Sequence, residues 1–315
     1  SSQFLPQVDG FVEREALKDY QGESCKMIMN GWFIHDTKQW PPSDQIDPLF
    51  VAFHINSQAK EQMLIAENLN YLKQHEPIGC RDTATVEMLK EKGVDAYFSG
   101  CMTLTLGNKY RDEKKDGSIY FVDPYFEYKK DPISIISNLL YALLHLTNIK
   151  KIYKSFPHRI GGLVKLAKVS AFYRVYRKLF ADEVLTRAEY ISQQSMYYNE
   201  KFKTNELLLL EAERLVRKYA KAQLVITSRI HCALPCLGMG TPVLYTENAN
   251  QSIESSCRMG GLIELFNVIK VDNNIFFPSF PIEGLIDERF KIKNSNNWKK
   301  YHEKLIETCN KFMST

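Results

Sequence analysis

Several patterns that would assign a protein to a class at once are missing from this 315-residue sequence. The seven cysteines are scattered without a CxxC pair, and Cys232 and Cys236 have no second Cys or His pair that would complete a zinc site. No Walker loop, HExxH motif or GxSxG motif occurs. Free thiols of this kind are typical of a reducing cytoplasm, so we expect a cytoplasmic protein. Because these motifs are missing, we expect neither a metal nor an organic cofactor.

Long apolar runs and a large net charge are also missing. The longest apolar segment, 133–146, is shorter than the roughly 18 residues that span a bilayer, and polar residues interrupt it. The net charge of +4 gives no argument for nucleic acid as a partner. We therefore expect a soluble protein, or one at the inner face of the plasma membrane. Because the chain opens on Ser-Ser-Gln without a methionine, we also expect that a leading segment is missing.

The charges are unevenly distributed in the middle of the chain. Between Asp131 and Asp182 there is no acidic residue, whereas nine Lys and Arg occur there with aromatic residues between them. An anionic membrane surface or a lipid-pyrophosphate acceptor would attract such a stretch. A solvated linker has the same appearance. Both interpretations stay open for residues 150–178.

Short apolar runs alternate with helical patterns over the first 130 residues. Strands are expected at Lys26–Met29, Leu49–His54, Pro77–Cys80, Asp95–Phe98, Met102–Leu106 and Ile119–Val122. Two helices are expected between them, Gln58–Gln74 and Thr83–Lys92, the second with Asp82 as its N-cap. Strands that alternate with helices predict a parallel sheet.

A helical pattern over Asp131–Lys154 leads to a second α/β half. Its expected elements are strand Glu183–Thr186, helix Asn205–Ala220, strand Leu224–Thr227, helix Ser228–Leu237, strand Pro242–Thr246 and terminal helix Trp298–Phe312. The sequence thus predicts the α/β class, with two Rossmann-like domains facing a central cleft in a GT-B-like arrangement. We expect an N-terminal domain at 1–130, a basic amphipathic helical connector at 131–181, and a C-terminal domain with the terminal helix at 182–315.

The segment richest in chemistry is the corner between the strand Leu224–Thr227 and the helix that follows it. Ser228, Arg229 and His231 come directly after the strand, where free backbone N–H groups and the helix dipole favour an anion. Taken singly, Arg229 reads as a salt-bridge residue and His231 as a core histidine. As a pair at such a corner, they favour a functional site.

Four segments resemble motifs of the polysaccharide pyruvyl transferase family. They are Thr227-Ser-Arg-Ile-His-Cys-Ala with Gly238-Met-Gly-Thr-Pro-Val-Leu, Pro77-Ile-Gly-Cys-Arg-Asp, Gly100-Cys-Met-Thr-Leu-Thr-Leu, and Asn30-Gly-Trp-Phe with Phe53-His-Ile-Asn. The resemblance covers residues 1 to about 270. Members of the family usually begin with a strand and an Asn-x-Gly-Asp loop, which this chain lacks. We therefore expect the N-terminal domain to be without its first strand and loop.

The resemblance implies an activity and a set of site residues. The activity is transfer of pyruvate from phosphoenolpyruvate to a hexose of a bacterial capsular or surface polysaccharide, or of its lipid-linked precursor, as a cyclic ketal. The resemblance also implies that Arg229 and His231 bind the donor, that Arg81 is the arginine of the Arg-Asp motif, and that His54 matches a further histidine implicated in relatives. We expect Arg229, Ser228 beside it and Arg81 to bind the donor, and His231 and His54 to be catalytic.

Three further residues are expected at the acceptor side of the cleft: Trp32, Asn30 and Thr103. Trp32 would stack on a sugar ring, although an aromatic residue in this setting is more often part of the core.

The chemistry of the reaction suits these residue types. Arginine binds planar carboxylates and phosphates through two parallel hydrogen bonds, and phosphoenolpyruvate carries both groups. Ketal formation needs one proton at the methylene carbon of the donor and the removal of another from a sugar hydroxyl. Histidine can serve either transfer, so we expect His231 to act as acid or base. This scheme needs no metal.

Two other classes of function stay open. A nucleotide-sugar glycosyltransferase of GT-B fold would also place basic residues at a helix start in its second domain. A non-catalytic glycan-assembly protein could retain the same fold, because fold does not fix function.

Overall fold

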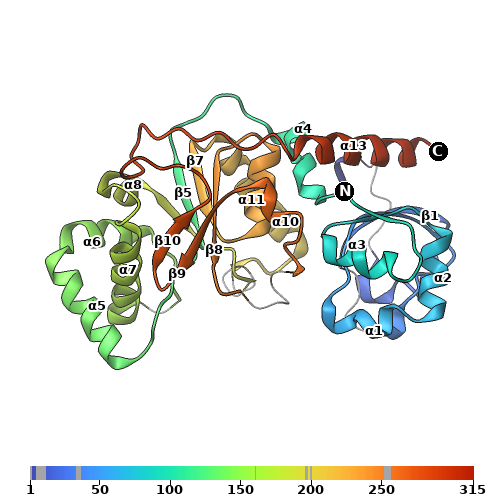
Figure 1. Ribbon diagram of the computed structural model, residues 1–315, viewed down its shortest axis with the longest axis horizontal. Helices are drawn as coiled ribbons and strands as arrows, with labels where there is room; N and C mark the ends of the chain where they lie inside the picture. The colour runs from blue at the N-terminus through green and yellow to red at the C-terminus, as the bar shows by residue number, and fades with distance from the viewer. Residues whose placement is uncertain are drawn as a thin grey trace. The chain divides into compact units, whose positions relative to one another are not determined.

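The computed structural model describes residues 2–4, 12–32, 37–159, 161–195, 198, 201–251 and 257–315. The protein is a mixed α/β structure with two sheets, and it divides into two compact units (Figure 1). Unit 1 consists of Ser1–Lys109, Ser252–Leu265 and Asn296–Thr315. Unit 2 consists of Tyr110–Gln251 and Phe266–Ser295. The α/β class predicted from the sequence is confirmed.

Unit 1 is built on a four-stranded parallel sheet in the order β1-β2-β3-β4. Its strands are β1 (Cys25–Gly31), β2 (Ile46–Phe53), β3 (Ile78–Cys80) and β4 (Ala96–Phe98). Its helices are α1 (Lys60–Met63), α2 (Ala66–Gln74), α3 (Thr83–Lys90) and α13 (Lys299–Ser314), while α4 (Gly107–Tyr110) ends at the boundary with unit 2. Because all four strands run in one direction, their carboxyl ends lie at the same edge of the sheet.

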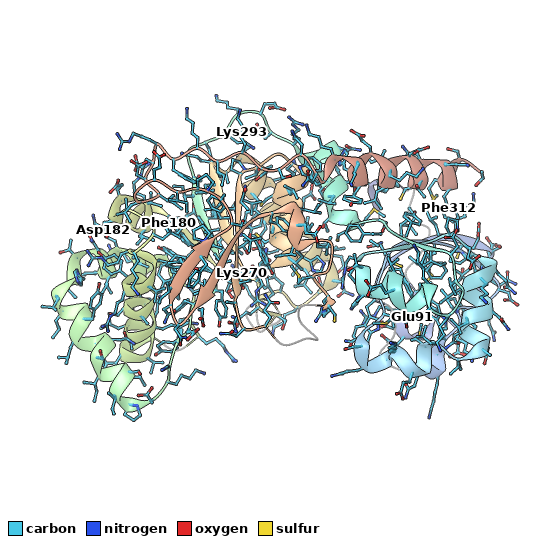
Figure 2. The ribbon with its side chains drawn as sticks, in the orientation of Figure 1. Glu91, Phe180, Asp182, Lys270, Lys293 and Phe312 are labelled. Carbon is cyan, nitrogen blue, oxygen red and sulfur yellow. The ribbon has the colours of Figure 1, made fainter. Side chains whose placement is uncertain are left out.

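The last helix of the chain, α13, belongs to unit 1. Leu305 and Cys309 of α13 are buried in one apolar cluster with Ile28 and Ala52 of the sheet. Phe312, labelled in Figure 2, packs against the same cluster. The sequence assigned this helix to the C-terminal domain, but its apolar stripe is covered by the N-terminal sheet.

Unit 2 is built on a six-stranded sheet in the order β10-β9-β8-β7-β5-β6. Its strands are β5 (Ile119–Val122), β6 (Glu189–Ile191), β7 (Leu224–Thr227), β8 (Val243–Asn248), β9 (Asn267–Asp272) and β10 (Ile275–Pro278). Its helices include α5 (Pro132–Leu144), α6 (Leu146–Ser155), α7 (Gly162–Tyr176), α8 (Asp182–Arg187), α10 (Asn205–Lys221) and α11 (Ile230–Gly238). Among the described strands of this unit, every pair is parallel except β9 with β10.

Helices α5, α6 and α7 stand together at one side of unit 2 (Figure 1). Ile149 of α6 and both Phe172 and Tyr176 of α7 are fully buried in one cluster with Phe121 and Ile226 of the sheet. The region that the sequence assigned to a connector is therefore part of the core of unit 2. Among the described residues, no single helix has the length and apolarity to cross a membrane. Helices α5 and α6 have that length and apolarity only when taken together, and the chain bends by 111° between them.

Two predicted strands are wrong, because both segments form helical turns. Met102–Leu106 is a 3-10 helix in which the Thr105 hydroxyl donates to the Met102 carbonyl (2.7 Å). Glu183–Thr186 lies inside α8, whose first turn carries Asp182 and Glu183 at the positive end of the helix dipole.

Two predicted helices are interrupted. Gln58–Gln74 divides into α1 and α2, and Asp131–Lys154 divides at His145 into α5 and α6. The His145 ring lies 4.4 Å from that of Tyr141 and receives a hydrogen bond from Arg177. These are contacts with neighbouring side chains, which a periodicity does not reveal.

Candidate functional site

Arg229 stands where the sequence predicts, at the corner between β7 and α11. Strand β7 ends at Thr227, and Arg229 is the N-cap residue of α11. The backbone N–H of Arg229 donates to the Thr227 hydroxyl (2.9 Å), which itself donates to the Val122 carbonyl of β5 (2.8 Å). Two neighbouring strands thus hold the corner in place.

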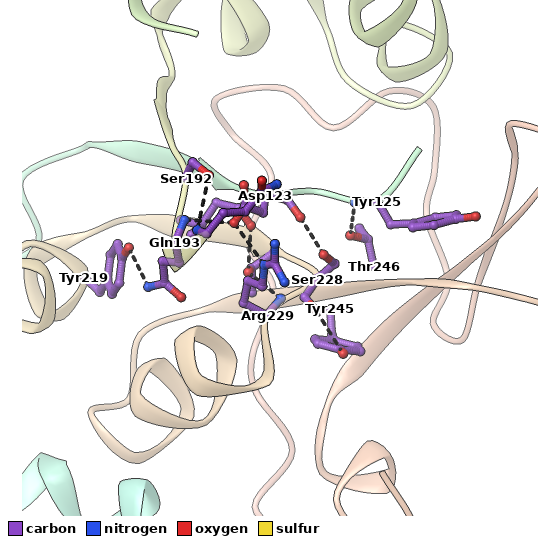
Figure 3. Close-up of polar contacts among 12 residues, drawn as sticks. Asp123, Tyr125, Ser192, Gln193, Tyr219, Ser228, Arg229, Tyr245 and Thr246 are labelled. Carbon is purple, nitrogen blue, oxygen red and sulfur yellow. Dashed lines mark hydrogen bonds and ion pairs between the residues drawn. The ribbon is translucent and has the colours of Figure 1, made fainter. Parts of the chain in front are cut away.

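The Arg229 guanidinium is oriented by Asp123, the residue that follows β5 (Figure 3). Its Nε donates to Oδ2 of Asp123 (2.9 Å), and the Gln193 backbone N–H donates to the same oxygen (2.8 Å). Asp123 is 12% exposed and Arg229 is 42% exposed. Since only Nε is used among the described residues, the two terminal amino groups of Arg229 remain available to a ligand.

A pocket of about 340 Å³ opens beside this pair. Its charged, serine and glutamine lining residues are Asp123, Lys130, Lys168, Ser192, Gln194, Ser228 and Arg229, and aromatic residues, two prolines and an isoleucine complete the wall. Neither Lys130 nor Lys168 has an acidic partner in the described part of the chain. Burial lowers the pKa of Lys168, an effect that Asp123 opposes and Lys130 reinforces. With its carboxylate engaged by arginine, the pocket suits an anionic ligand.

His231 lies in the first turn of α11 but lines a different pocket. It is exposed, and its pocket of about 300 Å³ is shared with Gln193, Tyr198 and Tyr219. Residues two apart on a helix point in different directions. The structure therefore does not bring the predicted pair of Arg229 and His231 into one pocket.

His54 of unit 1 is held by a buried carboxylate. It follows β2 directly and is 4% exposed, and its Nδ1 lies 2.6 Å from Oδ2 of Asp82. Oδ1 of Asp82 accepts from both the backbone N–H and the hydroxyl of Thr85 (2.9 Å each), so Asp82 is also the predicted N-cap of α3. Because a carboxylate only accepts, Nδ1 carries the proton. Nε2 is buried and has no partner among the described residues.

Arg81, which follows β3, is a buried cation. It is 8% exposed, and no described residue forms an ion pair with its guanidinium. Burial lowers the pKa of Arg81, which Cys101 and Asp82 oppose and Arg258 reinforces. A buried cation without an acidic partner is costly, so an anion bound at this position would be stabilised.

The three predicted acceptor-side residues lie near the carboxyl ends of β1 and β4. Asn30 is half-buried near the end of β1, where its amide donates to the Ile28 carbonyl (3.3 Å). Trp32, also half-buried, follows β1 directly. Thr103 lies in the 3-10 helix after β4, with its hydroxyl 3.2 Å from the Cys101 sulfur.

Sequence reasoning missed Asp123, Lys130 and Lys168 as site residues. A signal existed for Asp123, since it follows the predicted strand Ile119–Val122 at the edge where ligands bind in such sheets. Lys168 was only one cation of a basic stretch, and its partial burial in α7 has no local signature. In the described part of the chain, no three His, Cys, Asp or Glu side chains gather as a metal site requires.

In both units, cations and polar groups follow the carboxyl ends of parallel strands, an arrangement that suits anionic ligands in α/β proteins. Residues 59–250, more than half of the chain, match the model of the polysaccharide pyruvyl transferase family. The chain belongs to this family. Neither the curated proteins nor the solved structures gave a match. The matched span includes Arg81 and Arg229, whereas His54 lies outside it.

Proposed function

We propose that this protein transfers pyruvate from phosphoenolpyruvate to a hexose of a capsular or surface polysaccharide, or of its lipid-linked precursor. The family indicates a transferase that acts on polysaccharides, which supports transfer to a polysaccharide. We further propose phosphoenolpyruvate as the donor, a hexose as the acceptor and a cyclic ketal as the product. The reaction takes place in the bacterial cytoplasm and releases phosphate.

The observation that carries the proposal is the contact between His54 and Asp82. A carboxylate that fixes one imidazole nitrogen leaves the other poised for proton transfer. His231, by contrast, has no such carboxylate partner among the described residues. We therefore assign the principal proton transfers to His54 and keep His231 as the alternative for one of them.

Cations are proposed to bind the donor. Arg229 and Ser228, together with Lys168, line a pocket that suits a phosphate or carboxylate, and Arg81 offers a second, buried cation. We propose further that both units are Rossmann-like and act on one substrate pair at a central cleft, in a GT-B-like arrangement. Asn30, Trp32 and Thr103 would then meet the acceptor sugar.

The reaction balances with one histidine. Protonated His54 gives its Nε2 proton to the methylene carbon of the donor, and the positive charge develops at C2. A sugar hydroxyl adds to C2 and returns a proton to Nε2. The C2–O bond to phosphate then breaks, phosphate leaves with the bonding electrons, and the second hydroxyl closes the ring as its proton passes to solvent. The arginines stabilise the anionic groups throughout.

Donor binding tests this proposal against a nucleotide-sugar glycosyltransferase of the same fold. Phosphoenolpyruvate should raise the melting temperature, and nucleotide sugars should not. A panel of hexose-containing oligosaccharides should then include one that supports phosphate release from phosphoenolpyruvate. Stabilisation by nucleotide sugars alone would replace the proposal with the glycosyltransferase, and phosphoenolpyruvate binding without phosphate release would favour a non-catalytic role.

We also propose a peripheral contact between residues 150–178 and an anionic membrane surface. Lys150, Lys151, Lys154 and Arg159 are exposed, and no acidic residue lies in this stretch. Such a contact would bring the protein to a lipid-linked acceptor.

A further inference from the structure

Helix α5 presents its aliphatic side chains to the outside of unit 2. Ile133, Ile136, Leu140 and Leu143 are 80%, 57%, 59% and 69% exposed. Their spacing of three and four residues places them on one face of the helix. Leu144 and Leu146, at the turn into α6, are also more than half exposed. This outer face is the α5 apolar face.

The polar groups of α5 point inward, toward α7. The Ser137 hydroxyl accepts from Arg174 (3.3 Å), and the Tyr141 hydroxyl accepts from Arg177 (3.1 Å). Asn138 is buried. A helix on a water-exposed surface has the opposite polarity, with its apolar stripe toward the core. The α5 apolar face is therefore built for contact with an apolar medium.

Charge identifies that medium. Helix α5 has no charged side chain, and the exposed cations Lys150, Lys151 and Lys154 lie on the adjoining α6. An aliphatic face next to cations, with no acidic residue from 132 to 181, is complementary to an anionic lipid surface. A second copy of the same patch would instead bring like charges together.

We infer that α5 lies flat in the interface of an anionic bilayer, with its apolar face among the acyl chains. The inference rests on the membrane contact proposed above for residues 150–178. It adds that α5, which lies outside that range, is the helix that enters the lipid. At 13 residues α5 is about 20 Å long, shorter than the roughly 30 Å hydrocarbon core, and the chain bends by 111° after it. These dimensions fit a helix that lies on the bilayer.

The test compares paired substitutions in the full chain. The double variant Leu140→Gln/Leu143→Gln removes the centre of the apolar face, and Leu209→Gln/Leu210→Gln is its control. The control leucines are 63% and 62% exposed on α10 of the same unit, among acidic residues. Flotation with phosphatidylcholine vesicles, with and without phosphatidylglycerol, measures binding, and circular dichroism melts check folding.

Wild type and the α10 control should bind the phosphatidylglycerol vesicles, and the α5 double variant should bind at least about tenfold more weakly. Leu143→Trp should bind like wild type and gain emission that brominated acyl chains quench. Wild-type affinity in the α5 variant would overturn the inference while leaving the basic contact intact. Loss of a dimer in the α5 variant, with no vesicle binding by wild type, would make the face a self-association surface instead.

Discussion

Asp82 contacts Nδ1 of His54 through one carboxylate oxygen and caps α3 through the other. The substitution Asp82→Asn separates these two roles. The amide oxygen can still accept from Thr85, but the amide N–H₂ would donate to Nδ1, which moves the imidazole proton to Nε2. We expect turnover to fall about a hundredfold or more, with donor affinity changed far less.

A matched control exists for this prediction. Asp131 caps α5 with the same chemistry, accepting from the Ser134 backbone N–H at 2.9 Å. Asp131→Asn should keep full activity in solution. If Asp82→Asn is equally active, Asp82 serves only as a cap.

The two histidines are distinguished by single-turnover phosphate release. His54→Gln keeps a side chain that can hydrogen bond but cannot titrate, so release should slow by about a hundredfold or more. His231→Gln should slow it by a smaller factor, since His231 lies outside the pocket that contains Arg229. The reverse order would return the principal proton transfer to His231.

Loss of Arg229 should weaken donor binding. Removing a charged hydrogen-bond donor from an anion costs about 1.5–3 kcal/mol, so Arg229→Ala should bind phosphoenolpyruvate roughly tenfold to a hundredfold more weakly. Arg229→Lys, which keeps the charge but not the planar fork, should fall between it and wild type. The control Arg217→Ala removes an exposed arginine of α10 that pairs with Glu213. Titration calorimetry measures all four proteins, and an unfolded Arg229→Ala would show that its ion pair with Asp123 is structural.

Donor affinity should fall with rising pH because of Lys168. Its pKa is lowered by burial, so it loses its proton at a lower pH than the ordinary value of 10.5. Above about pH 8 the donor phosphate is already fully ionised, and the change in affinity then reports the protein. Lys168→Gln should bind more weakly at neutral pH and show a flatter profile, whereas Lys178→Gln should follow wild type.

Unfolding does not explain such a loss of affinity. For a lysine whose pKa is lower in the folded state, the unfolded chain binds more protons between the two pKa values. The contribution of Lys168 to stability therefore rises with pH in this range. A pH profile that is the same in wild type and Lys168→Gln would remove Lys168 from the donor site.

Helix α13 should matter for the stability of unit 1. Leu305 is 2% exposed, and truncation of a buried leucine costs about 2–5 kcal/mol. Leu305→Ala should therefore lower the denaturation midpoint clearly, while Glu307→Ala, on the exposed side of the same helix, should not. Equal midpoints for both variants would contradict the packing of α13 on the sheet of unit 1.

Local signals in the sequence were enough for the α/β class, the corner at Arg229 and the cap at Asp82. Each depends on residues close in the chain: a buried strand followed by a helix start, or an aspartate followed by a helix. The contacts that shape the two sites join distant residues. His54 meets Asp82 across 28 positions, and Asp123 meets Arg229 across 106. A local pattern in one sequence does not reveal which distant residues pair in this way.

The sequence also did not show which face of a helix packs against the core. Periodicity in α5 predicted an amphipathic helix, but which side faces the core depends on Arg174 and Arg177 of α7, which bind its polar groups. The same limit applies to α13, whose apolar stripe is evident in the sequence while its partner sheet is not.

The return of α13 to unit 1 has a consequence for biosynthesis. The sheet of unit 1 leaves the ribosome early, but the helix that covers Ile28 and Ala52 is translated only after all of unit 2. Unit 2 is continuous enough to fold while it emerges, whereas the face of the first sheet that α13 covers stays exposed until α13 has been translated. During that interval the nascent chain exposes an apolar surface that a chaperone would recognise.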